Sequence, residues 1–170
     1  YTYTISDGQG GTSTATVSGT ITPVNDPPVA VNDTNATTEN TPVTGSVITN
    51  DSDLDGDVLT ISAVNGAAGN VGTGVTGSNG GSFTIAANGD YSFDPGTNFD
   101  DLAVGQTRTT AVRDTISDGA GGAITATGTI PVTGTNDTPV STAIPAQTSN
   151  DGNAVALDVS PHFADVDTGD

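Results

Sequence analysis

Apolar residues alternate with polar ones in short runs along the chain, and turn-forming residues separate these runs. Residues 58–64 (VLTISAV) show the alternation clearly, and residues 42–48 (PVTGSVI) form an earlier run of the same kind. Residues 109–116 and 124–132 supply a final pair of runs. Alternation over a few residues is typical of a strand with one buried face, and no window shows a convincing helical period. The pattern therefore predicts an all-β domain.

The clearest local prediction is a β-hairpin turning at Asn88-Gly89, between residues 81–85 (GSFTI) and 90–93 (DYSF). An Asn-Gly pair between two alternating apolar runs is the strongest short-range hairpin signal. Side chains alternate along a strand. The residues expected to share one buried face are Phe83, Ile85, Tyr91 and Phe93. We expect these aromatic side chains to fill a core, and about seven strands in a domain of this size fit an immunoglobulin-like β-sandwich.

The chain contains an internal repeat with an offset of 111 residues. Its clearest matching segments are residues 4–11 (TISDGQGG) and 115–122 (TISDGAGG). The same offset, without a gap, aligns residues 14–16 with 125–127, 25–26 with 136–137, and 28–29 with 139–140. A shared offset with no insertion indicates tandem copies of one domain.

The offset divides the chain into three predicted parts. Residues 1–27 would be the final strands of a preceding repeat, residues 28–138 one complete β-sandwich repeat, and residues 139–170 the opening strands of a following repeat. We interpret the chain as an excerpt of a longer array. Residues 157–163 (LDVSPHF) have no counterpart in the complete repeat. We therefore expect the following repeat to be a related sandwich of another subfamily.

Charge changes this picture from a generic sandwich to one with candidate metal sites. The chain has 20 acidic and 2 basic residues, a formal net charge of -18, and Glu39 as its sole Glu. Asp suits turns and is a common ligand for hard cations, so the skew toward Asp favours divalent-cation sites over a merely solvated surface. Two Arg residues are too few for phosphate contacts, which argues against nucleic acid or an anionic membrane surface as a partner. No segment is apolar for long enough to insert directly into a membrane, and Cys is absent.

One acidic cluster lies in residues 50–57 (NDSDLDGD), where carboxylates stand at every second position. In a turn, this spacing lets several carboxylates converge on one calcium ion, which takes six to eight oxygen ligands. The run resembles the opening of an EF-hand loop, but Ser62 stands where the closing Glu would be, so it is not an EF-hand. The alternative is a polar turn between two strands. The candidate ligands in this cluster are Asp51, Asp53, Asp55 and Asp57.

Other candidate ligands stand near the predicted repeat boundaries. Asn-Asp pairs occur in both linkers, and an Asp-x-Asp run opens the following repeat as another does in the complete one. Asp118 is a further candidate, although the glycines of its Asp-Gly-x-Gly-Gly turn would also simply permit a tight hairpin. The candidates outside the first cluster are Asp26, Glu39, Asp118, Asn136, Asp137, Asp165 and Asp167.

These motifs resemble known repeat families. An acidic linker, a Glu near the start of the domain and Asp-x-Asp in the next domain are similar to the calcium sites of cadherin repeats. The ordered motifs in residues 89–95, 99–105, 116–119 and 134–137 resemble the VCBS repeat of large type I-secreted (RTX-type) bacterial adhesins. Residues 159–167 resemble the start of a dystroglycan-type cadherin-like domain. One departure is visible: the family's aromatic alternation, present at Tyr1 and Tyr3, is lost at Val112 and Asp114.

The resemblance implies a calcium site at each repeat junction. At the first, Asp26 of the linker would join Asp53 and Asp55. At the second, Glu39 would join a set supplied by the linker and the following repeat. That set is Asn136, Asp137, Asp165 and Asp167.

The resemblance also implies a function, a calcium-stiffened spacer repeat of a large secreted or cell-surface bacterial adhesin. Its partners would be neighbouring repeats of the same protein. Two alternatives stay open: a subunit of an extracellular filament or sheath, joined to other copies of the chain by strand exchange, and a calcium-dependent carbohydrate-binding module. We expect no enzymatic activity, since Lys is absent, His162 is the only His, and the carboxylates stand in repeated turns instead of one cleft.

Overall fold

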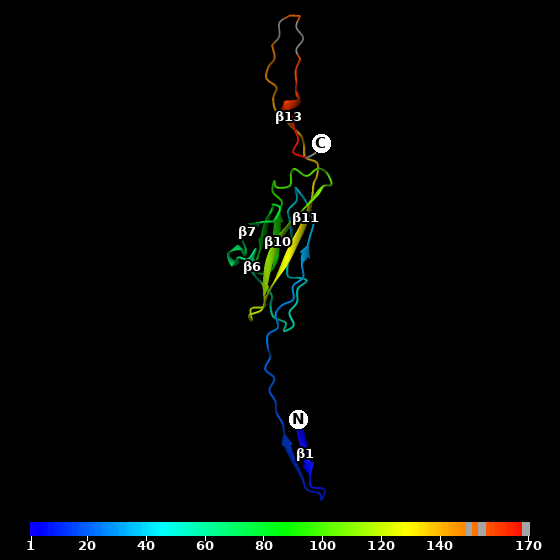
Figure 1. The fold of residues 1–170 in the computed structure, drawn as a ribbon, viewed down its shortest axis with the longest axis vertical. Helices are drawn as coiled ribbons and strands as arrows, with labels where there is room; N and C mark the ends of the chain where they lie inside the picture. The colour runs from blue at the N-terminus through cyan, green and yellow to red at the C-terminus, as the bar shows by residue number, and fades with distance from the viewer. Residues whose placement is uncertain (149–150, 153–155, 168–170) are drawn as a thin grey trace.

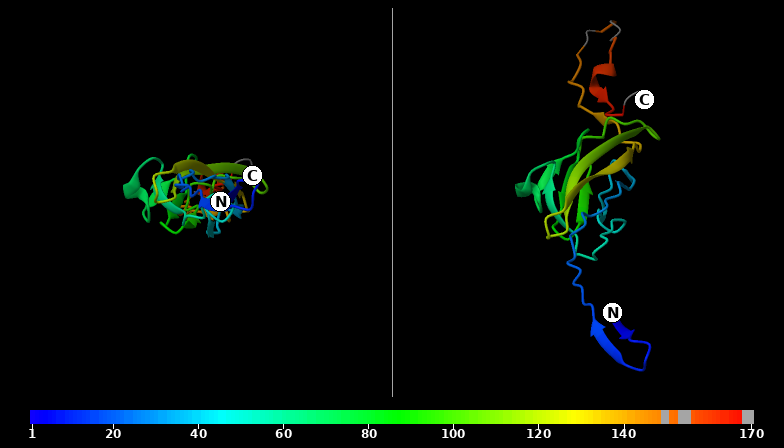
Figure 2. Two further views of the ribbon diagram at one scale, coloured as in Figure 1. Left: turned by 90° about the horizontal axis from the view of Figure 1, so that it is seen from below. Right: turned by 60° about the horizontal axis from the view of Figure 1, so that its bottom comes forward.

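A computed structural model of the chain describes residues 1–148, 151–152 and 156–167. A central body lies between an N-terminal hairpin and a C-terminal segment, which extend from its opposite ends (Figure 1). The view along the long axis shows a much narrower cross-section (Figure 2). The hairpin consists of β1 (Thr2–Ser6) and β2 (Thr12–Thr16). The C-terminal segment contains β12 (Val140–Ser141), the 3-10 turn η2 (Ser160–His162) and β13 (Phe163–Ala164).

The body consists of two sheets whose buried faces enclose one core. The first sheet has the strand order β3-β11-β10-β6, with β4 also paired to β11, and the second has the order β5-β9-β8-β7. The strands of the first sheet are β3 (Asp33–Thr34), β4 (Thr37–Thr38), β6 (Thr60–Val64), β10 (Thr107–Ser117) and β11 (Ala123–Thr133). Those of the second are β5 (Val43–Ser46), β7 (Gly74–Thr76), β8 (Ser82–Ile85) and β9 (Asp90–Asp94). A 3-10 turn, η1 (Ala68–Asn70), follows β6.

The antiparallel pair β10–β11 extends from one end of the body to the other. Its register is unbroken from the pair Thr107 and Thr133 to the pair Ser117 and Ala123. Its tight loop lies at the end from which the N-terminal hairpin extends, and its open end lies beside the C-terminal segment (Figure 1). The pair therefore links the two junctions of the chain through one continuous ladder of backbone hydrogen bonds.

Aromatic side chains fill the core between the sheets. The ring centroids of Phe83 and Phe93 are 4.5 Å apart, and those of Phe93 and Phe99 are 6.4 Å apart in an edge-to-face arrangement. Phe83, Ile85 and Phe93 are fully buried, and Tyr91 packs half-buried against the same cluster. Since Phe83 pairs with Phe93, and Ile85 with Tyr91, in adjacent strands, the predicted hairpin and its buried face are both confirmed.

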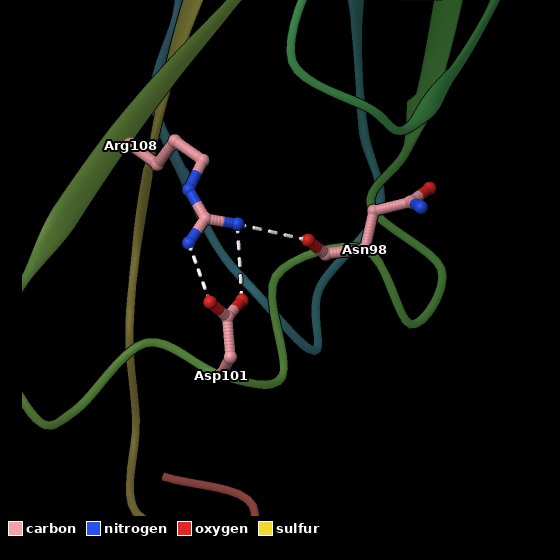
Figure 3. Close-up of polar contacts among 3 residues, drawn as sticks. All are labelled: Asn98, Asp101 and Arg108. Carbon is pink, nitrogen blue, oxygen red and sulfur yellow. Dashed lines mark hydrogen bonds and ion pairs between the residues drawn. The ribbon is translucent and has the colours of Figure 1, made fainter. Parts of the chain in front are cut away.

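A charged contact secures the loop after β9 over the core. Arg108 on β10 donates two hydrogen bonds to the carboxylate of Asp101 and one to the carbonyl oxygen of Asn98 (Figure 3). Its guanidinium carbon also lies 5.8 Å from the ring centroid of Phe99. These hydrogen bonds lower the pKa of Asp101 below its ordinary value. Arg108, one of only two Lys or Arg residues in the chain, thus holds the loop that carries the core residue Phe99.

The all-β prediction is confirmed, with differences in detail. Two single 3-10 turns are the only helical elements among the described residues. The sequence pattern missed the two-residue strands β3 and β4 and the strand β7, because such short pairings leave no alternating run. His162 lies in η2, directly before β13. Parts of the predicted third repeat, residues 149–150, 153–155 and 168–170, lie outside the described residues.

We expect Phe93→Ala to lower the free energy of unfolding by about 3–5 kcal/mol, because it removes the ring at the centre of the aromatic cluster and leaves a cavity. Phe163→Ala is the matched control, since Phe163 is 58% exposed and its loss should change stability by less than about 0.5 kcal/mol. Urea unfolding followed by circular dichroism measures both. Equal losses in the two variants would contradict the core assignment.

Candidate metal centres at the ends of the sandwich

Glu39 lies at the end of the body that faces the C-terminal segment. It follows β4, which pairs in parallel with the end of β11, and its backbone N–H donates to the carbonyl oxygen of Thr133 at 3.0 Å. The side chain is 1% exposed. Its Oε1 accepts hydrogen bonds from the backbone N–H and the hydroxyl of Thr135, whereas Oε2 is buried without a hydrogen-bond partner. A buried acceptor left in this state is costly unless another ligand satisfies it.

Gly134 fixes the start of the linker beside Glu39. Its backbone N–H donates to the carbonyl oxygen of Gln106 at 2.8 Å, and its own carbonyl oxygen accepts from Gly105 at 3.1 Å. A Cβ atom at this position would collide with the carbonyl oxygens of Leu102 and Ala103. Only glycine therefore permits this close approach. The approach brings the next residue, Thr135, into position to donate its hydrogen bonds to Glu39.

The linker and the following segment complete this acidic group. The backbone N–H of Asp137 donates to Oδ2 of Asp167 at 3.0 Å, and the backbone N–H of Asp167 donates to Oδ1 of Asp165 at 3.0 Å. Asn136 donates from its side chain to the carbonyl oxygen of Asp137 at 2.6 Å. Asp167 is 5% exposed. These contacts turn the Asp167 carboxylate toward the end of the body.

Three carboxylates from three separate segments therefore converge. Ligand oxygens of Glu39, Asp137 and Asp167 all lie within 4.8 Å of one another. One oxygen of each, Oε2, Oδ2 and Oδ1 respectively, is buried without a hydrogen-bond partner. Calcium–oxygen bonds are about 2.3–2.6 Å long, so oxygens at this spacing fit around one ion. We call this set the C-terminal junction site.

A second acidic group lies at the opposite end of the body. Oxygens of Asp53, Asp55 and Asp57 also lie within 4.8 Å of one another. Oδ1 of Asp53 accepts from the backbone N–H groups of Asp55 and Asp57 at 2.9 and 3.3 Å, while its Oδ2 is buried without a partner. Burial, and then the charges of its acidic neighbours, raise the pKa of Asp57. We call this set the N-terminal junction site.

The linker and the β10–β11 loop hold this second site in place. The backbone N–H of Asp26 donates to Oδ2 of Asp55 at 2.7 Å, and the side chain of Asn25 donates to Oδ2 of Asp118 at 2.9 Å. Asp118 also accepts from the backbone N–H groups of its own loop. These hydrogen bonds, led by that from Asn25, lower the pKa of Asp118. Asp118 is therefore held as a carboxylate that ties the linker to the body.

The two junctions repeat the same local structure. The bond from Asp26 to Asp55 has its equivalent from Asp137 to Asp167. In each Asp-x-Asp run, the backbone N–H of the second Asp donates to the carboxylate of the first. In each linker, the Asn side chain donates to the carbonyl oxygen of the next residue. The strand pairing between Val29 and Ser52 likewise recurs between Val140 and Ala164. The sequence repeat thus has a counterpart in hydrogen bonding.

Not every predicted ligand belongs to these two groups. Asp26 and Asp165 adjoin them, the first through its backbone N–H and the second by accepting from Asp167. Asp51 does not belong to the group of Asp53, Asp55 and Asp57, and its Oδ1 accepts from the backbone N–H of Val31 at 2.8 Å. Sequence reasoning also missed two acids whose buried oxygens have no partner, Asp33 and Asp114. The sequence did contain one indication for Asp114: it is an acid at a position of an alternating strand that should face inward.

The fold and the two acidic junctions define a sandwich domain of the cadherin-like class. The family of bacterial cadherin-like domains matches residues 25–134, and the chain belongs to this family. Such domains are generally structural and typically bind calcium, which agrees with two acidic groups that could hold a metal ion. In the described residues, no helix has the length and apolar character needed to cross a membrane.

Other comparisons add little. A search of curated proteins finds no match for the chain. A similar solved structure is described as a nucleoside hydrolase-related hypothetical protein from Saccharophagus degradans that is associated with carbohydrate metabolism. It is 16% identical, with a TM-score of 0.39, and the match covers 65% of this chain and 26% of that one. The chain thus spans about a quarter of that protein, and a likeness this weak assigns it neither fold nor activity.

We expect Glu39→Gln to stabilise the chain when cations are removed by a chelator. The amide keeps an acceptor for Thr135 but removes one of three like charges, whose repulsion at this spacing is worth roughly 1–3 kcal/mol per pair. Thermal melting measures the change, with the exposed Asp90→Asn as a control that should shift stability by less than about 0.5 kcal/mol. A clear loss of stability in chelator would show that the Glu39 charge is compensated without any cation.

Proposed function

We propose that the chain is a calcium-stiffened structural spacer, with one Ca²⁺ site at each junction between successive repeats. The C-terminal junction site carries the proposal, because Glu39 belongs to the body, Asp137 to the linker and Asp167 to the following segment. An ion bound by all three would cross-link parts of the chain that otherwise share few contacts. The corresponding ligands at the other junction are Asp53, Asp55 and Asp57, with Asp118 and Asp26 beside them.

Electrostatics explain why the cation would control stiffness. Two carboxylate charges within 4.8 Å of one another repel by roughly 3 kcal/mol or more at the effective dielectric constant of a protein surface. Without a cation, this repulsion opposes the few hydrogen bonds across each junction, and the linkers bend. With calcium, the same carboxylates become ligands, and the ion stabilises the aligned state by mass action. Millimolar extracellular calcium would fill even weak sites of this kind.

The repeat supports a role within a longer array. Ile5 on β1 is 62% exposed, whereas Ile116, its equivalent on β10, is fully buried. The hairpin β1–β2 thus presents an apolar face of the kind that a sandwich covers. We propose that it closes a preceding repeat, that residues 28–138 form a complete repeat, and that residues 139–170 open the next. The partners of the chain would then be its neighbouring repeats.

Membership in the bacterial cadherin-like family supports a place at the cell surface or outside the cell. We propose that the parent protein is a large adhesin of the VCBS, RTX-associated type that leaves the cell by type I secretion. The repeats would then act as a non-enzymatic stalk that holds an adhesive part away from the cell. Family membership, the tandem repeat and the acidic junctions all support this assignment.

We expect calcium to narrow the distribution of distances across the C-terminal junction. The chain has no Cys, so spin labels can be attached solely at Ser92→Cys and Gln147→Cys. Both positions are exposed; Ser92 lies on β9 of the body, and Gln147 lies in the C-terminal segment. Double electron–electron resonance should give a broad distribution in chelator and a narrow one in millimolar calcium, because the ion joins the body to the following segment.

Matched variants make this test specific. Glu39→Gln should keep the distribution broad in calcium, whereas Asp158→Asn, which alters an exposed carboxylate that accepts from Ser160, should narrow like the wild-type chain. Equal widths with and without calcium would contradict the proposed stiffening.

A further inference from the structure

Asp114 is a buried acid in the interior of the sandwich, away from the surface loops that carry the junction sites. Its side chain is 0% exposed, and both of its carboxylate oxygens are buried without a hydrogen-bond partner. The repeat offset aligns Asp114 with Tyr3 of the preceding copy. An ionised group in this state is costly unless a counter-charge or hydrogen bonds compensate it. Since the preceding copy has no acid there, the cost is particular to this repeat.

Strand register places a second acid on the same inner face. Asp114 on β10 is paired with Ala126 on β11, and Asp33 on β3 is paired with Gly128 two positions further along β11. Directly paired residues, and residues two apart on a strand, project from the same face. The small residues Ala126 and Gly128 therefore separate the two acids on this face. Asp33 is half-buried, and its Oδ2 is buried without a hydrogen-bond partner.

A third acid, Asp51, lies near enough for its charge to act on both, and it is held by the loop that follows β5. Oδ1 of Asp51 accepts from the backbone N–H of Val31 at 2.8 Å, and the side chain of Asn50 donates to the carbonyl oxygens of Val31 and Asn32. These bonds hold residues 50–51 against the segment that leads into β3. Oδ2 of Asp51 is buried without a partner. The set thus contains four such oxygens, two from Asp114 and one each from Asp33 and Asp51.

The folded chain provides no cationic side chain for this set. Arg108 is bound to Asp101, and Arg113 adjoins Asp114 on β10 but points to the exposed, opposite face. Burial, and then the charges of Asp33 and Asp51, together raise the pKa of Asp114 to about 6. Burial and the charge of Asp51 also raise the pKa of Asp33. Like-charged groups at these positions destabilise the fold unless a positive charge enters.

We propose that Asp33, Asp51 and Asp114 form a third site for a hard divalent cation such as Ca²⁺, with one buried ligand inside the sandwich and no ligand shared with either junction site. Unlike those of the junction sites, the oxygens of these three residues do not all lie within 4.8 Å of one another, so the carboxylates would turn inward around the ion. Their unpartnered oxygens would then supply protein ligands, and water at the half-exposed sides of Asp33 and Asp51 would complete the coordination. The ion would join β3, β10 and the 47–59 loop. It would therefore stabilise the repeat itself and leave the angle between repeats unchanged.

We expect Asp114→Asn to remove one bound calcium ion per chain, measured by equilibrium dialysis at neutral pH. Calcium should also raise the melting temperature less in this variant than in the wild-type chain. Asp114→Tyr, which restores the residue of the preceding copy, should behave in the same way. If either variant of Asp114 fails to fold, Asp33→Asn tests the same site at a half-buried position. An unchanged number of bound ions in soluble, folded variants would overturn the proposal.

The junction sites can be separated from this one in the same assay. The double variant Glu39→Gln, Asp55→Asn weakens both junctions but leaves the three interior acids intact. The double variant should retain one calcium ion, and adding Asp114→Asn should remove that ion. The distances across the junctions should respond to Glu39→Gln and Asp55→Asn but not to Asp114→Asn. If the double variant binds as much calcium as the wild-type chain, the junction proposal fails and the interior site stands or falls on Asp114→Asn alone.

Discussion

Buried carboxylate oxygens that lack a hydrogen-bond partner are the constraint on which the rest of this structure depends. They occur at both ends of the sandwich and in its interior. The sequence contains only two Lys or Arg residues that could compensate their charge. A protein seldom keeps such groups without a ligand, because leaving a buried polar atom unsatisfied costs about 1–3 kcal/mol and a charged one more. We therefore propose that the fold is a frame that bound cations complete.

The sandwich places these oxygens through its longest element. The β10–β11 pair runs between the two ends of the body, with Asp118 in its loop and Gly134 directly after its final strand. Asp118 ties down the preceding linker through Asn25, and Gly134 positions the donor that orients Glu39. A single hairpin thus fixes ligands at both junctions.

Much of the fold could be predicted from alternation and from one Asn-Gly turn, because the strands involved are long enough to show a period. Phe83, Ile85 and Phe93 were assigned to the core on this basis, and they are buried. The strands β3 and β4 could not be predicted, since two residues show no alternation. Their omission hid the position of Asp33 on the inner face and left the direction of Glu39 open, because both depend on pairing with β11. The pairing of strands that are distant in the sequence determines which acidic side chains lie close together, and a single sequence does not show this pairing.

We propose that calcium occupies the C-terminal junction site, and crystals grown in calcium would reveal the ion itself. Anomalous difference density should appear between Glu39, Asp137 and Asp167, with ligand distances of about 2.3–2.6 Å. The same map of Glu39→Gln crystals should show that peak weakened or lost. A wild-type map with no density at this position, and with the three carboxylates turned apart toward solvent, would contradict the account.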